Sequence, residues 1–149
     1  MQEETNGRPE TRALEAYTKL LRAAGSTSST IQRGIMAEER LTESQAGVLG
    51  ALMNHGPLTH TALARELQKT GGNITLVIDN LEKRKLVKRV RNSTDRRIVE
   101  VHLTSRGGRL IERIYPRLVE EIVDRMSALT AAEQDELGRL CRKLGLERS

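Results

Sequence analysis

Less polar residues recur at helical spacing near the start of the chain. Alternating three and four residues apart, they are Leu14, Tyr17, Leu21, Ala24, Ser28, Ile31 and Ile35. This heptad-like spacing is typical of helices that pack side by side, although a helix docked on its own core shows it too. We therefore expect a helix from Thr11 to Ile35, in which Gly25 and the Ser-Thr run after it permit a bend. Residues 1–10 are polar, lack periodicity and are interpreted as a mobile tail.

Two shorter helices follow, each with a recognisable cap. Thr42 and Gln45 form a capping box, in which each side chain bonds the backbone of the other residue. An apolar face follows, and a Gly-Pro dipeptide ends this helix because neither residue favours its continuation. Thr59 is placed to cap a short helix that closes between Lys69 and Gly72.

The next helix is expected from Gly72 or Asn73 to Lys85. Its apolar positions recur every three or four residues, at Ile74, Val77, Ile78 and Leu81. These positions predict a buried face, and the first turn of the opposite face carries small polar groups that a narrow groove would admit. Gly71 and Gly72 lack the spacing of a phosphate-binding P-loop. They are expected to form the turn before the helix and to allow close approach of the backbone to a partner.

A β-hairpin is expected after this helix. Residues 86–91 and 98–103 both alternate between apolar and polar positions, and the Asn-Ser-Thr-Asp sequence at 92–95 is a turn signal. Basic side chains surround this turn. The sequence therefore predicts a hairpin with a cationic tip.

The remainder of the chain predicts two more helices. Thr104 is placed to cap a long helix with apolar residues at helical spacing, in which Pro116 indicates a kink or a break. A second capping box, made by Thr130 and Glu133, opens the last helix. The expected fold class is mainly α with one small β-hairpin.

The positive charge of the chain is concentrated in one segment. The 16 residues from Glu82 to Arg97 contain eight basic and two acidic side chains, a local net charge of +6, whereas the whole chain carries +5. The rest of the chain therefore sums to −1. A solvated helix face more commonly mixes both signs, so this segment favours a polyanionic partner such as nucleic acid.

Composition narrows the class of protein further. Phe and Trp are absent and only two Tyr occur, which argues against the base stacking that single-stranded nucleic acids usually require. The single cysteine, Cys141, cannot form an intramolecular disulfide. No secretory h-region or bilayer-length apolar run is present. We therefore expect a cytoplasmic protein with no membrane partner.

The titratable residues indicate neither catalysis nor a metal site. His55, His60 and His102 fall on different expected elements without metal-ligand spacing. Cys141 has no sequence signature of a nucleophile around it. We therefore expect no enzyme activity, no catalytic residue, no metal and no cofactor.

Three motifs are specific in combination. They are Leu41-Thr42-x-x-Gln45, the segment from Asn73-Ile74-Thr75 through Leu81-Glu82-Lys83-Arg84-Lys85-Leu86-Val87, and Asp95-x-Arg97 followed by Leu103-Thr104-x-x-Gly107. With these motifs, residues 11–145 resemble the MarR (multiple antibiotic resistance regulator) family of winged helix-turn-helix transcription factors. The resemblance implies a DNA-binding region at 41–107 and a helical dimerisation region at 11–40 and 108–149.

The resemblance also implies how each part meets double-stranded DNA. In the major groove it places Gly71, Gly72, Asn73, Thr75 and Leu76. In the minor groove it places the wing residues Asp95, Arg96 and Arg97, with Asp95 orienting Arg97. Phosphate contacts are expected from Thr59, Lys83, Lys88, Arg89 and Arg91, although solvated charge on the hairpin flank also explains the basic ones. The chemistry agrees, because an Asn amide pairs with adenine and Arg favours a narrow A·T-rich minor groove.

The expected function is that of a homodimeric repressor released from a palindromic operator by a small-molecule ligand. Both recognition helices would then bind half-sites roughly one helical turn apart. Two alternatives stay open: a winged-helix module that docks proteins, and a redox-sensing regulator that uses Cys141. A steep fall of affinity with salt would indicate DNA instead of protein docking.

A small aromatic or anionic effector is implied by family members that bind such ligands between the dimer helices and the DNA-binding lobe. Tyr17, Arg22, His55 and Tyr115 are the candidate ligand residues, and no spacing shows that they converge. One branch of the family senses peroxides through an N-terminal cysteine, but residues 1–40 contain none. Cys141 lies on the apolar face of the last helix and is expected to be a packed, inert thiol.

Overall fold

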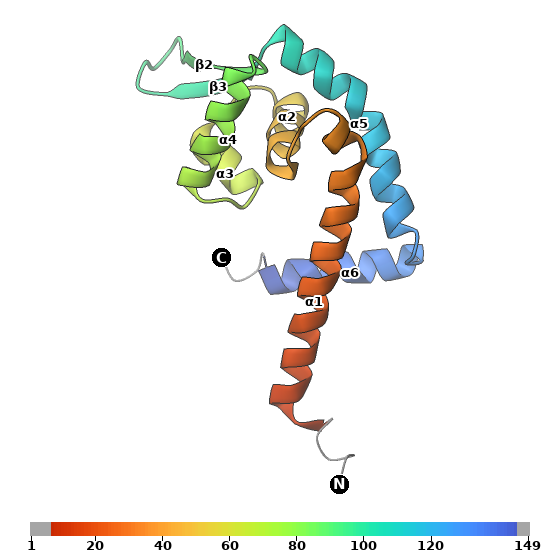
Figure 1. Ribbon diagram of the computed structural model, residues 1–149. Helices are drawn as coiled ribbons and strands as arrows, with labels where there is room; N and C mark the ends of the chain where they lie inside the picture. Colours follow the sequence, from red (N-terminus) through yellow and green to blue (C-terminus); the bar gives the residue numbers. More distant parts are fainter. Residues whose placement is uncertain (1–6, 146–149) are drawn as a thin grey trace.

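The computed structural model describes residues 7–145 and shows a mainly helical chain with a small antiparallel sheet, as expected. The elements in order are α1 (Pro9–Ile31), the π-helical turn η2 (Gln32–Met36), α2 (Glu43–His55), β1 (Leu58–Thr59), α3 (His60–Glu66), α4 (Gly71–Lys83), β2 (Val87–Arg91), β3 (Val99–Leu103), α5 (Ser105–Met126) and α6 (Ala131–Gly145). Helices α2 to α4 and the hairpin gather in one lobe, from which α1 and α5 extend (Figure 1).

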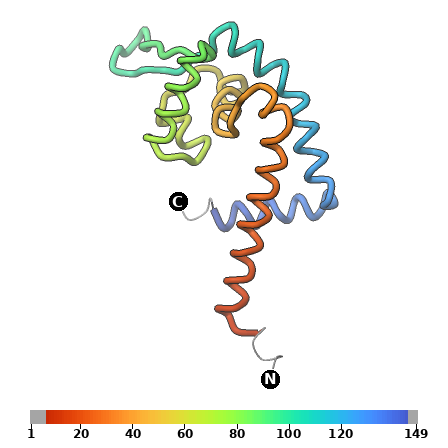
Figure 2. Tube along the Cα trace, viewed as in Figure 1, coloured from red at the N-terminus to blue at the C-terminus, as the bar shows by residue number. Residues whose placement is uncertain are grey.

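Helix α1 begins and ends earlier than the sequence suggested, and it passes Gly25 without a bend. It begins at Pro9, where the fixed φ of proline suits the first helical turn, so Pro9 and Glu10 are helical and not part of a tail. Residues 1–6 of the expected tail lie outside the described residues. The chain stays helical past Gly25, and the break comes instead at Gly34, whose ψ of −133° leaves the helical region. The N-terminal half of α1 extends beyond the rest of the molecule (Figure 2).

Helix α5 holds this break in place. The backbone N–H of Ile35 donates to Glu121 Oε1 at 2.9 Å, and a Cβ added at Gly34 would overlap the Glu121 carboxylate. Arg117 donates both Nη groups to the carboxylate of Glu38. The kink therefore exists because a side chain from α5 takes up the backbone group that the broken helix leaves free.

Helices α2 and α3 begin at the expected caps, Thr42 and Thr59, whereas the end of α3 and both ends of α4 differ from the expectation. Thr59 Oγ1 accepts from Ala62 N at 3.1 Å, and α3 ends at Glu66, before the 69–72 region. Thr70 then caps α4, so Gly71 and Gly72 form its first turn; the expectation that they make the inter-helix turn was wrong. Helix α4 ends at Lys83 because Lys85 adopts a left-handed φ of 61° and turns the chain into β2.

The hairpin belongs to a three-stranded sheet with the order β1-β3-β2. Strands β2 and β3 pair antiparallel, with Val87 opposite Leu103 and Arg89 opposite Val101. The two-residue β1 pairs Leu58 with Val101, and nothing in the alternation of the sequence indicated so short a strand. This pairing connects the segment before α3 to strand β3 of the hairpin.

Helix α5 starts against the end of α4. Thr104 Oγ1 accepts from Gly107 N at 3.0 Å and donates to the carbonyl of Lys85 at 2.7 Å, which confirms the expected cap. A side chain at Gly107 would overlap the carbonyl oxygen of Leu86, so the close approach requires glycine. Pro116 lies within α5, which continues to Met126, so of the two expected outcomes, a kink or a break, the break does not occur.

The core lies within the lobe and contains no residue of α6. Aliphatic side chains of α2, α4 and α5 are fully buried there, among them Leu49, Ile78 and Ile111. In contrast, every residue of α6 is exposed, and its capping box forms as expected. Within residues 7–145, no helix is long and apolar enough to cross a membrane.

Candidate nucleic-acid interface

The outer face of α4 carries the side chains that the sequence assigned to the major groove. Its inner face is anchored by Ile74, Ile78 and Leu81, each fully buried. That anchorage leaves Asn73 and Thr75 exposed, and Leu76 is 61% exposed. An exposed leucine next to small polar groups suits a surface that contacts base edges and thymine methyls.

The N-terminus of α4 is open as well as polar. Added side chains at Gly71 and Gly72 would meet no atom within 4 Å, so the backbone lies free there. The first turn contains no acidic residue. Since unpaired N–H groups give a helix N-terminus partial positive charge, this end of α4 favours a phosphate.

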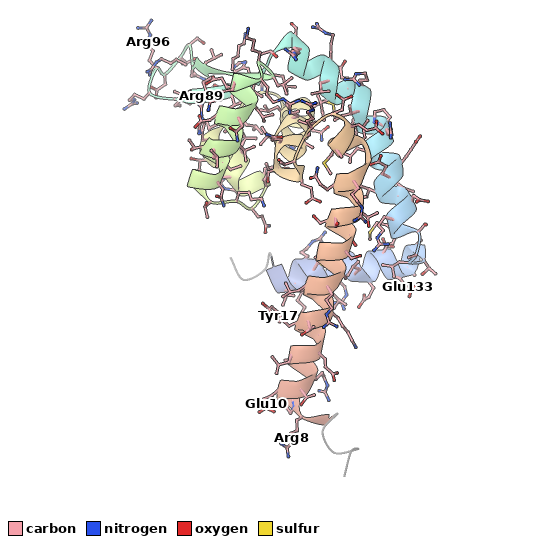
Figure 3. The ribbon with its side chains drawn as sticks, in the orientation of Figure 1. Arg8, Glu10, Tyr17, Arg89, Arg96 and Glu133 are labelled. Carbon is pink, nitrogen blue, oxygen red and sulfur yellow. The ribbon has the colours of Figure 1, made fainter. Side chains whose placement is uncertain are left out.

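The wing tip is organised around Asp95. Asn92 Oδ1 accepts from the backbone N–H groups of Thr94 and Asp95, which closes the turn. Asp95 then accepts from Arg97 Nε and Nη2, each at 3.0 Å. The hydrogen bonds from Arg97 hold the pKa of Asp95 below its usual value, so Asp95 stays ionised. Arg97 is nevertheless 90% exposed, and Arg96 projects from the tip (Figure 3).

The residues assigned to phosphates divide into two groups. Lys83, Lys88 and Arg91 are exposed, as phosphate contacts need to be. Arg89 is different: its side chain is only 24% exposed and its guanidinium is bound by carboxylates of α4. Thr59 uses its hydroxyl to cap α3, although a hydroxyl oxygen that accepts one hydrogen bond can still donate another. Sequence spacing alone did not distinguish Arg89 from its exposed neighbours.

A second group of arginines lies away from α4 and the wing tip. Arg84 donates to the backbone carbonyls of Glu39 and Arg40, while Arg106 and Arg109 extend from α5 beside it. With Arg113 they line a shallow cleft of about 700 Å³ that also contains Glu39 and Glu112. The charge count over residues 82–97 included only Arg84 of this group, because the other three arginines lie on α5.

A second, mainly apolar cleft of about 670 Å³ lies between α1, α2, α5 and α6. Of the four candidate ligand residues, His55 and Tyr115 line it, whereas Tyr17 and Arg22 do not. Figure 3 places Tyr17 on the part of α1 that extends below the lobe. The structure therefore joins only half of the proposed ligand set.

Arg125 and Cys141 also line this cleft, and the sequence did not assign either of them to the ligand. Arg125 donates from Nη2 to Ser26 Oγ at 3.0 Å and supplies a positive charge in a mainly apolar wall that also contains Glu43 and Glu66. It falls seven residues after Leu118 on the same α5 face, a spacing that could have indicated it. Cys141 also lines the cleft and is exposed, so in this chain the expectation of a packed thiol was wrong.

The histidines lie apart. His55 pairs with Glu66 at 3.3 Å, His60 accepts from Arg89, and His102 lies 3.7 Å from Glu100. Among the residues described, no three His, Cys, Asp or Glu side chains gather as metal ligands would.

Comparison with known proteins places the chain. A model of the MarR family matches residues 41–98. YkoM of Bacillus subtilis, an uncharacterised HTH-type transcriptional regulator, is 33% identical over 91% of this chain and 87% of its own. The HTH-type transcriptional repressor NicR of Pseudomonas putida is 31% identical over 87% of this chain and 82% of its own.

Solved structures agree with these relatives. Bordetella bronchiseptica BpsR matches with a TM-score of 0.78 and 28% identity, over 87% of this chain and 91% of its own. Staphylococcus aureus MepR, solved as a DNA complex, matches with a TM-score of 0.75 and 25% identity, over 86% and 95%. The chain belongs to the MarR family and is a winged helix-turn-helix transcriptional regulator.

Proposed function

We propose that the protein is a homodimeric repressor that binds a palindromic operator in the cytoplasm and leaves it when a small aromatic or anionic molecule binds. The observation that carries the DNA-binding part is the combination of an exposed reading face on α4 with a wing arginine held by Asp95. Gly71, Gly72, Asn73, Thr75 and Leu76 would meet the major groove. Arg97 and Arg96 would meet the minor groove beside it.

The dimer is supported by large apolar side chains that stay exposed in the described part of the chain, residues 7–145. Leu14 and Leu21 on α1 are 66% and 53% exposed, and Leu140 and Leu144 on α6 are 48% and 66% exposed. Helices bearing such faces gain stability when a second copy covers them, at roughly 25 cal/mol per Å² of apolar surface. Light scattering of the purified protein gives its molar mass and so shows whether two copies associate.

The effector part rests on the apolar cleft and on one relative. Its walls are mainly apolar, and Arg125, His55 and Tyr115 could orient a ligand. The acidic Glu43 and Glu66 also line the cleft, so an anion would bind on the Arg125 side. In Bordetella bronchiseptica BpsR, 6-hydroxynicotinic acid regulates DNA binding. An aromatic acid of similar size is thus the ligand class to test first.

Selection from a random-sequence duplex library tests the function. Wild-type protein is expected to enrich an inverted repeat whose half-sites lie about one helical turn apart. Binding should weaken steeply with added salt, because each neutralised phosphate releases counterions. Failure to enrich any sequence, or affinity that ignores salt, would contradict the proposal and favour a protein-docking role.

A further inference from the structure

Arg89 joins three elements of the DNA-binding lobe. From β2, its Nη2 donates to Asp79 at 2.5 Å and its Nη1 donates to Glu82 at 2.9 Å, both on α4. Its Nε donates to His60 Nε2 on α3 at 3.1 Å. The backbone N–H of Arg89 also donates to Glu82, at 3.2 Å. Figure 3 shows Arg89 beside α4, well behind the wing tip that carries Arg96.

The place of Arg89 along β2 gives these bonds their importance. Residues 87, 89 and 91 share one side of the strand, and along it the chain passes from buried Val87 through half-buried Arg89 to exposed Arg91. Arg89 is thus the outermost point at which this side of the wing is bonded to α4. Because Asn73 is carried by α4 and Arg97 by the wing, the bonds of Arg89 help to fix the distance between these two residues, beyond the point where buried Val87 packs into the core.

The bond to His60 requires a neutral imidazole. An arginine Nε always carries a hydrogen, so His60 Nε2 must accept and the ring proton must lie on Nδ1. In a protonated ring, Nε2 would also carry a hydrogen and could no longer accept from Arg89 Nε. The ring would also place a positive charge beside the positively charged guanidinium. Burial lowers the pKa of His60, Arg89 lowers it further, and Asp79 and Glu82 act in the opposite direction.

Other charged groups near this corner face elsewhere. Glu100 and His102 lie opposite Val90 and Lys88 in the β2–β3 register, so their side chains share the other face of the sheet. Glu66 of α3 is paired with His55. The charges that face His60 are therefore Arg89 from β2 and Asp79 and Glu82 from α4.

We propose that Arg89 is a positioning residue that holds the wing in register with α4, and that protonation of His60 releases this hold and weakens DNA binding in mild acid. The inference rests on the proposed DNA-binding function. Its sign is diagnostic, because added positive charge on a DNA-binding surface by itself strengthens binding to a polyanion.

The pH test uses a fluorescein-labelled duplex enriched by the wild-type protein and fluorescence anisotropy at constant ionic strength. Because the pKa of His60 lies below the ordinary histidine value of about 6.5, wild-type affinity is expected to stay level from about pH 7.5 to about pH 6.5 and to fall as pH drops further towards about 5. His60→Gln should remove most of this fall, because an amide oxygen can accept from Arg89 and does not titrate. The control His102→Gln should keep the wild-type response.

The second test separates positioning from general affinity. Hydroxyl-radical footprinting of Arg89→Gln at about pH 7.5 should lose the minor-groove protection of the wing and retain the protection at the α4 half-site. Arg89→Lys should behave like Arg89→Gln, since a lysine cannot reproduce the planar fork. The neighbouring variant Arg91→Gln should weaken both protections together.

Several results would overturn the proposal. They are wild-type affinity that stays level or rises in acid, an unaltered acid response in His60→Gln, and wing protection that persists in Arg89→Gln. Circular dichroism checks that each variant folds. If Arg89→Gln does not fold, the His60→Gln profile decides the matter. If the wild type enriches no duplex, the proposed function has failed.

Discussion

Asp95 accepts three hydrogen bonds from Arg97: from its backbone N–H, from Nε and from Nη2, each at 3.0 Å. A bidentate carboxylate restrains the rotation of the arginine while leaving its remaining donors exposed. The wing therefore offers an ordered cation at its tip, so less rotamer entropy is lost when the side chain enters a groove.

Removing this restraint should weaken DNA binding without removing the cation. Asp95→Ala is expected to weaken binding to duplexes with A·T-rich flanks, because the unrestrained arginine must then be ordered on binding. Arg97→Ala should cost more on the same duplexes, and adding Asp95→Ala to it should change little. Anisotropy titrations with A·T-rich and G·C-rich flanks measure both effects; equal losses on the two duplexes would count against minor-groove reading.

Acid should not release the Asp95 restraint near neutral pH. The pKa of Asp95 is lower than that of an ordinary aspartate. Its carboxylate therefore restrains Arg97 fully at any pH above the ordinary aspartate pKa, and this restraint is lost only as pH falls through the lowered pKa. Asp95→Ala should therefore leave intact any change of affinity between about pH 7.5 and about pH 5.5, the range in which histidines titrate. A changed pH profile in this variant would contradict that assignment.

The exposed face of α4 should determine base preference. Asn73→Ala is expected to reduce discrimination at one base pair of each half-site by about 1–3 kcal/mol, because the amide can no longer pair with a base edge. Lys83→Ala serves as the comparison: it should weaken all duplexes similarly and lower the salt slope by about one. Repeating the library selection with each variant shows whether the preferred sequence or only the affinity changes.

Gly107 should be intolerant of a side chain. Gly107→Ala forces a methyl group into the carbonyl of Leu86 and should destabilise the fold by about 3 kcal/mol, as overpacking does. Gly108→Ala meets no atom within 4 Å and, inside α5, should be neutral or stabilise by up to about 1 kcal/mol. Urea denaturation of the two variants provides the comparison, and equal stabilities would show that α5 can move away from Leu86.

The kink at Gly34 should depend on Glu121. Gly34→Ala is expected to destabilise the protein by about 2 kcal/mol because its methyl group overlaps the Glu121 carboxylate. In a Glu121→Ala background the same substitution should cost at least about 1 kcal/mol less, a coupling that a double-mutant cycle measures. Gly25→Ala is the matched control, with open space around it and an expected gain of about 1 kcal/mol.

Ligand binding should follow the cleft and not the set of residues expected from the sequence. A panel of aromatic acids should raise the melting temperature of the wild type, with about 2.7 kcal/mol of stabilisation at a hundredfold excess over Kd. Tyr115→Ala and Arg125→Ala should reduce this shift. Tyr17→Ala should not, because Tyr17 lies outside the cleft. The opposite ranking would move the binding site along α1.

Local signals in the sequence predicted the starts of α2, α3 and α5, but not the Thr70 cap of α4. A capping residue needs only the N–H groups two or three positions later, so Thr42, Thr59 and Thr104 were recognisable without a fold. The alternation of apolar and polar residues at 98–103 predicted β3, because it too depends only on neighbouring positions. The assignment of Gly71, Asn73 and Arg97 to DNA stays a prediction that their exposure permits.

Long-range contacts decided the rest. The helix breaks at Gly34 and not at Gly25 because Glu121, far along the chain, accepts the N–H of Ile35. The strand β1 exists because Leu58 meets Val101. The arginines at 84, 106 and 109 form one surface only when α5 packs on the turn after α4.

The sequence by itself determined the winged helix-turn-helix class, its caps and the concentration of positive charge, because each depends on neighbours within a few residues. Only the tertiary structure decided which arginine is available for DNA and which is held by the protein. Arg89 and Arg91 are the same residue type two positions apart, yet Arg89 meets Asp79, Glu82 and His60 while Arg91 is exposed. That difference arises from where α3 and α4 pack against the strand, which local spacing does not encode.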